Sequence, residues 1–124
     1  MREFSLFDMV AACALLAAAS FYNGVADAAD GEQAFAQCAA CHSTDGSNGV
    51  GPTLKGIVGR TSASVPGFVY SNAMKHAQVQ WTAAQLDKYL TNPQAAVPGN
   101  VMPYAGLTDA QQRAALITYL ATLK

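Results

Sequence analysis

The stretch that decides the fold is Cys38-Ala39-Ala40-Cys41-His42. In a C-x-x-C-H segment the two-residue spacer lets both sulfurs reach the vinyl groups on one edge of a haem, and the adjacent histidine then lies under the iron. The motif therefore predicts covalent attachment of one c-type haem through Cys38 and Cys41, with His42 as an axial ligand of the iron.

Two other kinds of site use the same residue types. A thioredoxin-like redox pair has C-x-x-C, but it needs no following histidine and lies in a β-α-β context that this sequence lacks. A structural zinc site needs four ligands, which Cys38, Cys41, His42 and His76 could supply. Because the adjacent Cys and His do not match the usual spacing of zinc ligands, we favour haem over both alternatives.

Composition narrows the class of protein further. The chain has 124 residues, which fits one domain. Hydrophobic residues make up 52% and charged residues 12%, which argues against a disordered protein. The formal net charge of −1 argues against a nucleic-acid-binding protein, which usually shows a basic excess. The three cysteines are too few for a disulfide scaffold, so their spacing carries the information.

The N-terminal residues differ from the rest of the chain. An apolar run over residues 9–22 is shorter than the roughly 20 residues that a membrane-spanning helix needs. The small residues 26–28 follow, and they fit an A-x-A cleavage site. We interpret residues 1–28, which include Cys13, as a signal peptide and residues 29–124 as the exported, periplasmic domain. An uncleaved membrane anchor is the alternative, because an acidic residue offsets the one arginine before the run.

Three helices are predicted where a capping residue is followed three positions later by glutamine. These pairs are Asp30 with Gln33, Thr82 with Gln85, and Thr108 with Gln111. The first helix is expected to reach Cys38 and the second to end at Pro93, and a fourth, short helix is expected over residues 71–78. Long loops connect them, so we expect a haem to fill the centre. Around it we expect a small core of Phe35, Phe68, Leu86, Leu90, Leu116 and Ile117.

Met102 is the predicted second axial ligand. It lies in the segment 98–103, where a proline at each end makes the loop stiff enough to hold a weak thioether ligand. The alternative is a methionine that only fills the core, but a helix would suit that role better. Met74 lies among helix-like polar residues and is interpreted as packing, and His76 as a surface histidine.

Together these features resemble class I cytochrome c over residues 31–124. Gly51-Pro52-Thr53-Leu54 is similar to the family's loop behind the proximal histidine, which implies that the Pro52 carbonyl accepts the His42 N–H. Residues 66–70 with Trp81 are similar to the region around the haem propionates. Further implied haem-binding residues are Arg60, Tyr70 and Trp81 as propionate partners, and Tyr89 on the helix that packs on the distal side.

The resemblance implies an all-α fold of three to five short helices, with long loops wrapped around one covalently bound haem. It implies a monomeric one-electron carrier, not an enzyme, with no nucleic-acid partner and with membrane contact only if the leader is retained. The implied donor is a quinol–cytochrome c oxidoreductase, and the acceptor is a terminal oxidase, a photosynthetic reaction centre or a periplasmic reductase. The alternatives are a haem enzyme or gas sensor with an open sixth position, and a permanently docked oxidase subunit.

Five positions depart from the family's usual residues, and one of them is Met74, which stands where the mitochondrial type has an asparagine bound to buried water. Asn100 stands where threonine is common, Val101 where lysine is usual, and Tyr104 where phenylalanine is usual. Gln37 precedes the first cysteine of the motif. The ring of docking lysines known from the mitochondrial type is therefore thin, and we expect partner docking to depend little on charge.

Overall fold

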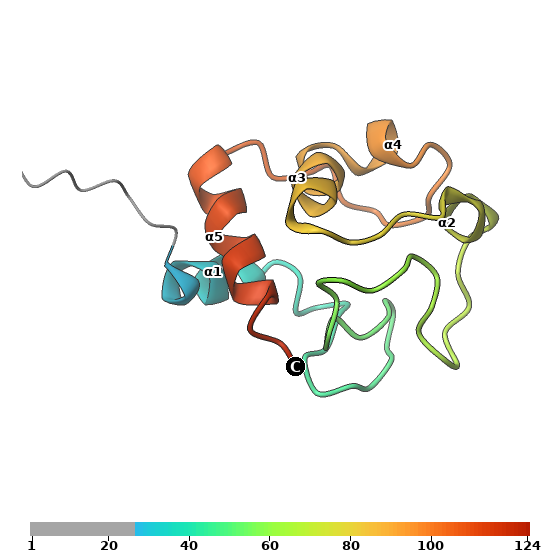
Figure 1. The fold of residues 1–124 in the computed structure, drawn as a ribbon, viewed down its shortest axis with the longest axis horizontal. Coiled ribbons are helices and arrows are strands. Elements are labelled where there is room, and N and C mark those ends of the chain that lie inside the picture. The colour runs from blue at the N-terminus through green and yellow to red at the C-terminus, as the bar shows by residue number, and fades with distance from the viewer. Residues whose placement is uncertain (1–26) are drawn as a thin grey trace, which may run out of the picture.

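The computed structural model describes residues 27–124, which form five helices joined by long loops (Figure 1). The helices are α1 (Ala28–Phe35), α2 (Asn72–Ala77), α3 (Ala83–Thr91), α4 (Pro93–Ala96) and α5 (Ala110–Leu120). The described residues contain no strand, only an isolated antiparallel bridge between Thr61 and Gln80. The predicted all-α fold is confirmed. The signal peptide, its anchor alternative and Cys13 concern residues that lie outside the described part, apart from positions 27 and 28.

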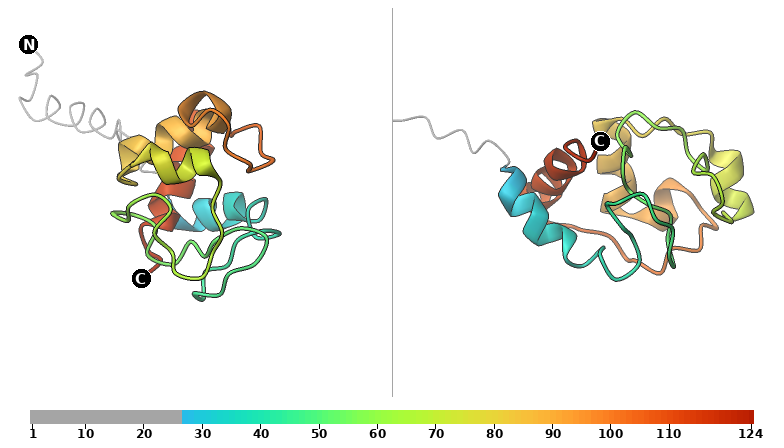
Figure 2. Two further views of the ribbon diagram at one scale, coloured as in Figure 1. Left: turned by 90° about the vertical axis from the view of Figure 1, so that its right-hand side faces the viewer. Right: turned by 90° about the horizontal axis from the view of Figure 1, so that it is seen from below.

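α1 and α5 cross in close contact, as two views show (Figures 1 and 2). Gly31 is buried at the crossing, where a Cβ would overlap the Ala115 carbonyl oxygen and lie 2.6 Å from the Tyr119 Cβ. The Phe35 ring packs against the Tyr119 ring with centroids 5.4 Å apart. Because α1 is packed against α5 in this way, the position of its C-terminal end is fixed. The haem motif follows directly after that end.

Two helices begin at a different residue from the predicted one. α1 is capped by Asp27, whose carboxylate accepts from the Ala29 N–H at 3.0 Å, so Asp30 lies in its first turn. α5 is capped by Asp109, which accepts from the Gln112 N–H at 2.9 Å, and not by Thr108. At α5 the reason is that aspartate caps a helix better than threonine, and at both helices the charge of the capping aspartate suits the positive end of the helix dipole.

The two middle helices begin as predicted. Ser71 caps α2 and Thr82 caps α3, each accepting from the backbone N–H three residues on. The helix that was expected to end at Pro93 ends at Thr91. Pro93 instead begins the four-residue α4, a helix that the sequence did not predict. Proline is well tolerated in a first turn because its missing N–H would have no partner there.

The core lies between α3, α5 and the end of α1. Of the predicted core residues, Phe35, Leu86, Leu90, Leu116 and Ile117 are buried. Phe68 is only half-buried, because its side chain lines the cavity described below and not the core. Among the described residues, none of the helices has the length and apolar character that crossing a bilayer requires.

Candidate functional site

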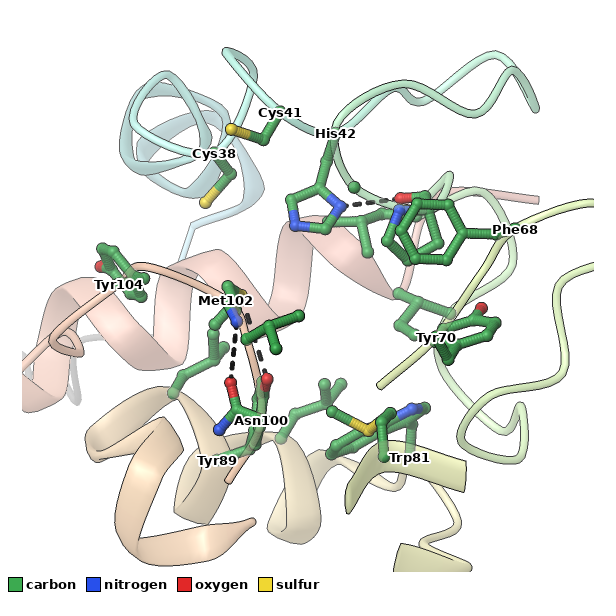
Figure 3. A pocket seen from close by; sticks show the side chains of 18 of the residues that line it. Cys38, Cys41, His42, Phe68, Tyr70, Trp81, Tyr89, Asn100, Met102 and Tyr104 are labelled. Atoms are coloured by element: carbon green, nitrogen blue, oxygen red, sulfur yellow. Dashed lines mark hydrogen bonds between the residues drawn. The ribbon is translucent and has the colours of Figure 1, made fainter. Parts of the chain in front are cut away.

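A cavity of about 290 Å³ opens between the haem motif, the loops after it and the segment after α4 (Figure 3). Its walls are mostly apolar. All nine predicted site residues line it: Cys38, Cys41, His42, Pro52, Arg60, Tyr70, Trp81, Tyr89 and Met102. His76 is exposed on α2 and does not line the cavity, so it does not complete the four-ligand zinc set.

The motif continues α1 as a series of tight turns. α1 ends at Phe35 and not at Cys38 as predicted, but the Cys38 N–H still donates to the Phe35 carbonyl at 2.8 Å. The Cys41 and His42 N–H groups then donate to the Cys38 carbonyl at 3.1 and 3.0 Å. Both thiols are free and partly buried, and burial raises the pKa of the Cys38 thiol. Figure 3 shows both sulfurs on one side of the cavity, with the His42 ring pointing into it.

The His42 ring is oriented by the backbone behind it. Its Nδ1 lies 2.7 Å from the Pro52 carbonyl oxygen, which can only accept, so the hydrogen is on Nδ1. The lone pair of Nε2 is therefore free to bind a metal, the arrangement that is usual for ligand histidines. At Gly51, a Cβ would lie 2.5 Å from the His42 Cε1 and 2.7 Å from Nδ1. Glycine is thus the residue that lets the chain pass directly behind the ring.

Met102 is held by its own backbone and by a hydroxyl. The Tyr89 hydroxyl donates to the Met102 Sδ at 3.9 Å, and burial raises the pKa of Tyr89 to about 12, so that the hydroxyl stays protonated. The Met102 N–H donates to the buried side chain of Asn100 at 3.0 Å. The Asn100 amide in turn donates to the carbonyls of Pro93 at 2.9 Å and Val97 at 2.8 Å. α4 therefore fixes Met102 through one fully bonded asparagine.

The implied propionate partners lie on other walls of the cavity. The Arg60 guanidinium donates to two backbone carbonyls, each at 2.9 Å, and burial lowers its pKa. It has five N–H donors, so further donors are left for a carboxylate. The Tyr70 hydroxyl accepts from the Val65 N–H at 3.2 Å. The Trp81 ring packs on the Tyr89 ring with centroids 5.0 Å apart.

Several residues have structural roles in the site that the sequence did not predict. Gly51 lies directly behind the His42 ring, and the Asn100 side chain holds the Met102 backbone. The Tyr104 hydroxyl donates a hydrogen bond to the Gln37 side chain at 2.8 Å. Met74, interpreted as packing, packs against the core and also lines the cavity. Asn100 and Tyr104 stood out only as departures from the family's usual residues.

These residues fit a c-type haem. Two thiols lie along one edge of an apolar cavity, and an imidazole nitrogen and a thioether sulfur line its walls. Arginine, tyrosine and tryptophan, which can all donate to carboxylates, complete the lining. Side chains of this kind supply both the covalent attachment and the axial ligands of haem in proteins.

Comparison with known proteins gives the same class. The family model for cytochrome c matches residues 28–124. Cytochrome c2 of Rhodomicrobium vannielii is 45% identical over 116 residues, covering 92% of this chain and 91% of that protein. A protein named cytochrome c-type cyt cy from Rhodobacter capsulatus is 51% identical over 98 residues, which cover 78% of this chain but 49% of the relative. This chain therefore spans about half the length of that relative.

A solved structure shares the fold as well. Cytochrome cH from Methylobacterium extorquens superposes with a TM-score of 0.75 at 43% identity, covering 77% of this chain and 98% of that one. The fold and the site thus define a small all-α protein that binds c-type haem. The chain belongs to the cytochrome c family: its haem c is attached covalently through Cys38 and Cys41, and it is a haem-based electron carrier.

Proposed function

We propose that this protein is a one-electron carrier in which His42 and Met102 are the two axial ligands of the haem iron. The observation that supports this most directly is that both side chains enter one apolar cavity while each is fixed from behind. His42 is held by the Pro52 carbonyl, and Met102 by the Asn100 side chain and the Tyr89 hydroxyl. When bound, haem c supplies a reversible one-electron couple whose potential is raised by His/Met ligation.

The chain's own residues then act as holders and not as reactants. Filling both axial positions leaves no coordination site for oxygen or peroxide, so we propose no enzymatic turnover. The apolar lining keeps water from the iron, and the donors of Arg60, Tyr70 and Trp81 orient the propionates. The rival reading, an enzyme or gas sensor, requires the position opposite His42 to be open.

We further place the protein in the periplasm as a monomer, diffusing freely or tethered by its leader. Its donor is a quinol–cytochrome c oxidoreductase, and its acceptor is a terminal oxidase, a photosynthetic reaction centre or a periplasmic reductase. Similarity to cytochrome c2 supports this assignment. Mass determination of the mature N-terminus distinguishes a cleaved signal peptide from a retained anchor, and with it a free carrier from a tethered one.

The test of the ligand set compares two methionines that line the same cavity. Ferric Met-ligated haem in this family shows a weak far-red absorbance. Met102→Ala is expected to abolish that band, lower the reduction potential and let the ferrous protein bind CO. Met74→Ala, the matched control, is expected to leave the band in place. The opposite pair of results would assign the ligand to Met74, and a wild-type protein without the band would favour the open-site alternative.

A further inference from the structure

The segment 101–106, which carries Met102, is tied to the protein by few hydrogen bonds. Its ends are anchored, because the Asn100 N–H donates to the end of α4 at 3.1 Å and the Leu107 N–H donates to α3 at 2.7 Å. Between these anchors the Met102 N–H donates to the Asn100 side chain, and the Tyr104 N–H donates to the Met102 carbonyl at 2.9 Å. Both bonds are local. In the described part of the chain, two side-chain bonds join this segment to distant residues. One runs from the Tyr89 hydroxyl of α3 to the Met102 Sδ at 3.9 Å, and the shorter one runs from the Tyr104 hydroxyl to Gln37 at 2.8 Å.

Gln37 is itself fixed in place. Its side-chain Nε2 donates to the Ala34 carbonyl of α1 at 3.1 Å, which turns Oε1 toward the Tyr104 hydroxyl 2.8 Å away. Gln37 directly precedes Cys38 and follows the helix that is packed against α5. The two partners are 67 residues apart in sequence and both line the cavity. Figure 3 shows Tyr104 on the side of the cavity where Cys38 lies.

We propose that Tyr104 is a positioning residue for Met102, and that its hydrogen bond to Gln37 holds the Met102 segment closed beside Cys38. This inference rests on the proposed role of Met102 as an axial ligand. A phenylalanine at position 104 would fill the same space but could not make the bond. The fold does not depend on it, since both partners lie at the surface or half-buried. The bond instead sets how often the segment lifts and Met102 leaves the iron.

The experiment titrates the ferric holoprotein with imidazole and follows the loss of the far-red band. Imidazole can bind the iron only in molecules whose Met102 has left, so its apparent affinity measures the open fraction. A hydrogen bond of ordinary net strength shifts such an equilibrium roughly fivefold. Tyr104→Phe is therefore expected to raise the apparent imidazole affinity by about that factor.

Tyr119→Phe is the matched control. It removes the hydroxyl of another half-buried tyrosine, on α5, for which the described structure gives no hydrogen bond. It is expected to leave the imidazole affinity at the wild-type value. An increase as large as that of Tyr104→Phe would overturn the proposal, because the effect would then not depend on this bond.

A double-mutant cycle tests the pairing. Gln37→Leu cuts the same bond, so the double variant with Tyr104→Phe is expected to bind imidazole no more tightly than the tighter single variant. Gln37→Glu keeps an oxygen acceptor and is expected to stay closer to the wild type. Additive effects of the two single changes, or an unchanged affinity in Tyr104→Phe, would overturn the proposal.

Different results would contradict the ligand role of Met102 and the positioning role of Tyr104. A wild-type protein without the far-red band, or a Met102→Ala variant that keeps it, would remove Met102 as a ligand and the positioning role with it. A band that is present in the wild type, lost in Met102→Ala and indifferent to Tyr104→Phe would overturn the positioning role alone.

Discussion

At the scale of single residues, the position of the His42 ring is decided by the two backbone residues behind it. Pro52 supplies the carbonyl that orients Nδ1, and Gly51 supplies the absence of a side chain. The Gly51 N–H also donates to the Cys41 carbonyl at 2.8 Å, which ties the loop back to the motif. The orientation and the close packing of the His42 ring thus come from neighbouring positions, and a change at either one is expected to move the ring.

Gly51→Ala is expected to displace the ring, because the new Cβ would lie 2.5 Å from the His42 Cε1. Overpacking of this kind costs about 1–3 kcal/mol, so the free energy of unfolding of the ferric holoprotein is expected to fall by that amount. Denaturant unfolding measures it. Gly49→Ala is the control, since its Cβ would meet its nearest neighbour at 3.6 Å. Equal losses in the two variants would contradict the role given to Gly51.

Sequence reasoning located the residues whose types are chemically distinctive. The cysteines, His42 and Met102 all line the cavity, because motif spacing and a proline-braced loop indicate them directly. The bond between Tyr104 and Gln37 could not be predicted in this way. Tyrosine and glutamine are common surface residues, and only the folded chain brings together positions 67 residues apart.

At the scale of helices, the sequence located each long element but not always its first residue. Two residues that can cap lie close together at both misplaced starts, Asp27 with Asp30 and Thr108 with Asp109. At α1 the glutamine three positions after Asp30 pointed to the wrong residue. At α5 both candidates have a glutamine three positions on, Gln111 and Gln112, so the capping-box pattern alone could not choose between them. At Thr82, where no second capping residue lies nearby, the prediction was confirmed.

The start of α5 offers a direct comparison of two neighbouring side chains. Asp109→Ala removes the carboxylate that accepts from the Gln112 N–H, and loss of such a cap costs about 1 kcal/mol. Thr108→Ala is expected to change the free energy of unfolding by much less, because α5 is capped by its neighbour. Denaturant titration of both variants measures the difference. A larger loss in Thr108→Ala would place the cap at the predicted residue after all.

At the scale of the whole molecule, the haem that fills the cavity is expected to contribute a large share of the free energy of unfolding. The five short helices and the loops between them leave a cavity of about 290 Å³. An enclosed empty cavity costs about 24 cal/mol per Å³. Because this cavity opens to solvent on one side, roughly 7 kcal/mol is the upper limit of its cost. That is comparable to the whole stability of a typical domain, about 5–15 kcal/mol. Haem is thus part of the core.

A protein produced without haem, with Cys38→Ser and Cys41→Ser to prevent attachment, is therefore expected to lack fixed tertiary structure. Its near-ultraviolet circular dichroism is expected to be lost, and its denaturant transition to be broad or absent. The haem-bound wild type is the control. A cooperative transition in the haem-free protein would show that the loops close the cavity without the cofactor.

The distribution of charge decides how the molecule meets its partners. Among the described residues that line the cavity, Arg60 has the one permanent charge, and its guanidinium lies on backbone carbonyls. Val50 and Val101 are each 76% exposed and also line the cavity. Arg113 is paired with Asp87 at 2.7 Å, which leaves it little influence on an approaching protein. The exposed lysines are Lys55, Lys75, Lys88 and Lys124, none of which lines the cavity.

The exposed residues that line the cavity, which we call its rim, include the uncharged Val50 and Val101. An uncharged rim predicts weak electrostatic steering of an approaching partner. Charged clefts raise association rates by about 10–10³-fold, and exposed charges are screened beyond about 8 Å at physiological ionic strength. The association rate with the proposed donor, a purified quinol–cytochrome c oxidoreductase, is therefore expected to fall by less than roughly tenfold between low and physiological salt. Stopped-flow reduction of the ferric protein at several salt concentrations measures this rate. A variant with Val50→Lys and Val101→Lys, two exposed residues that line the cavity, places positive charge beside its opening and is expected to show a much steeper fall. If the wild type falls as steeply as that variant, the scattered lysines act together at the rim, and docking is electrostatic.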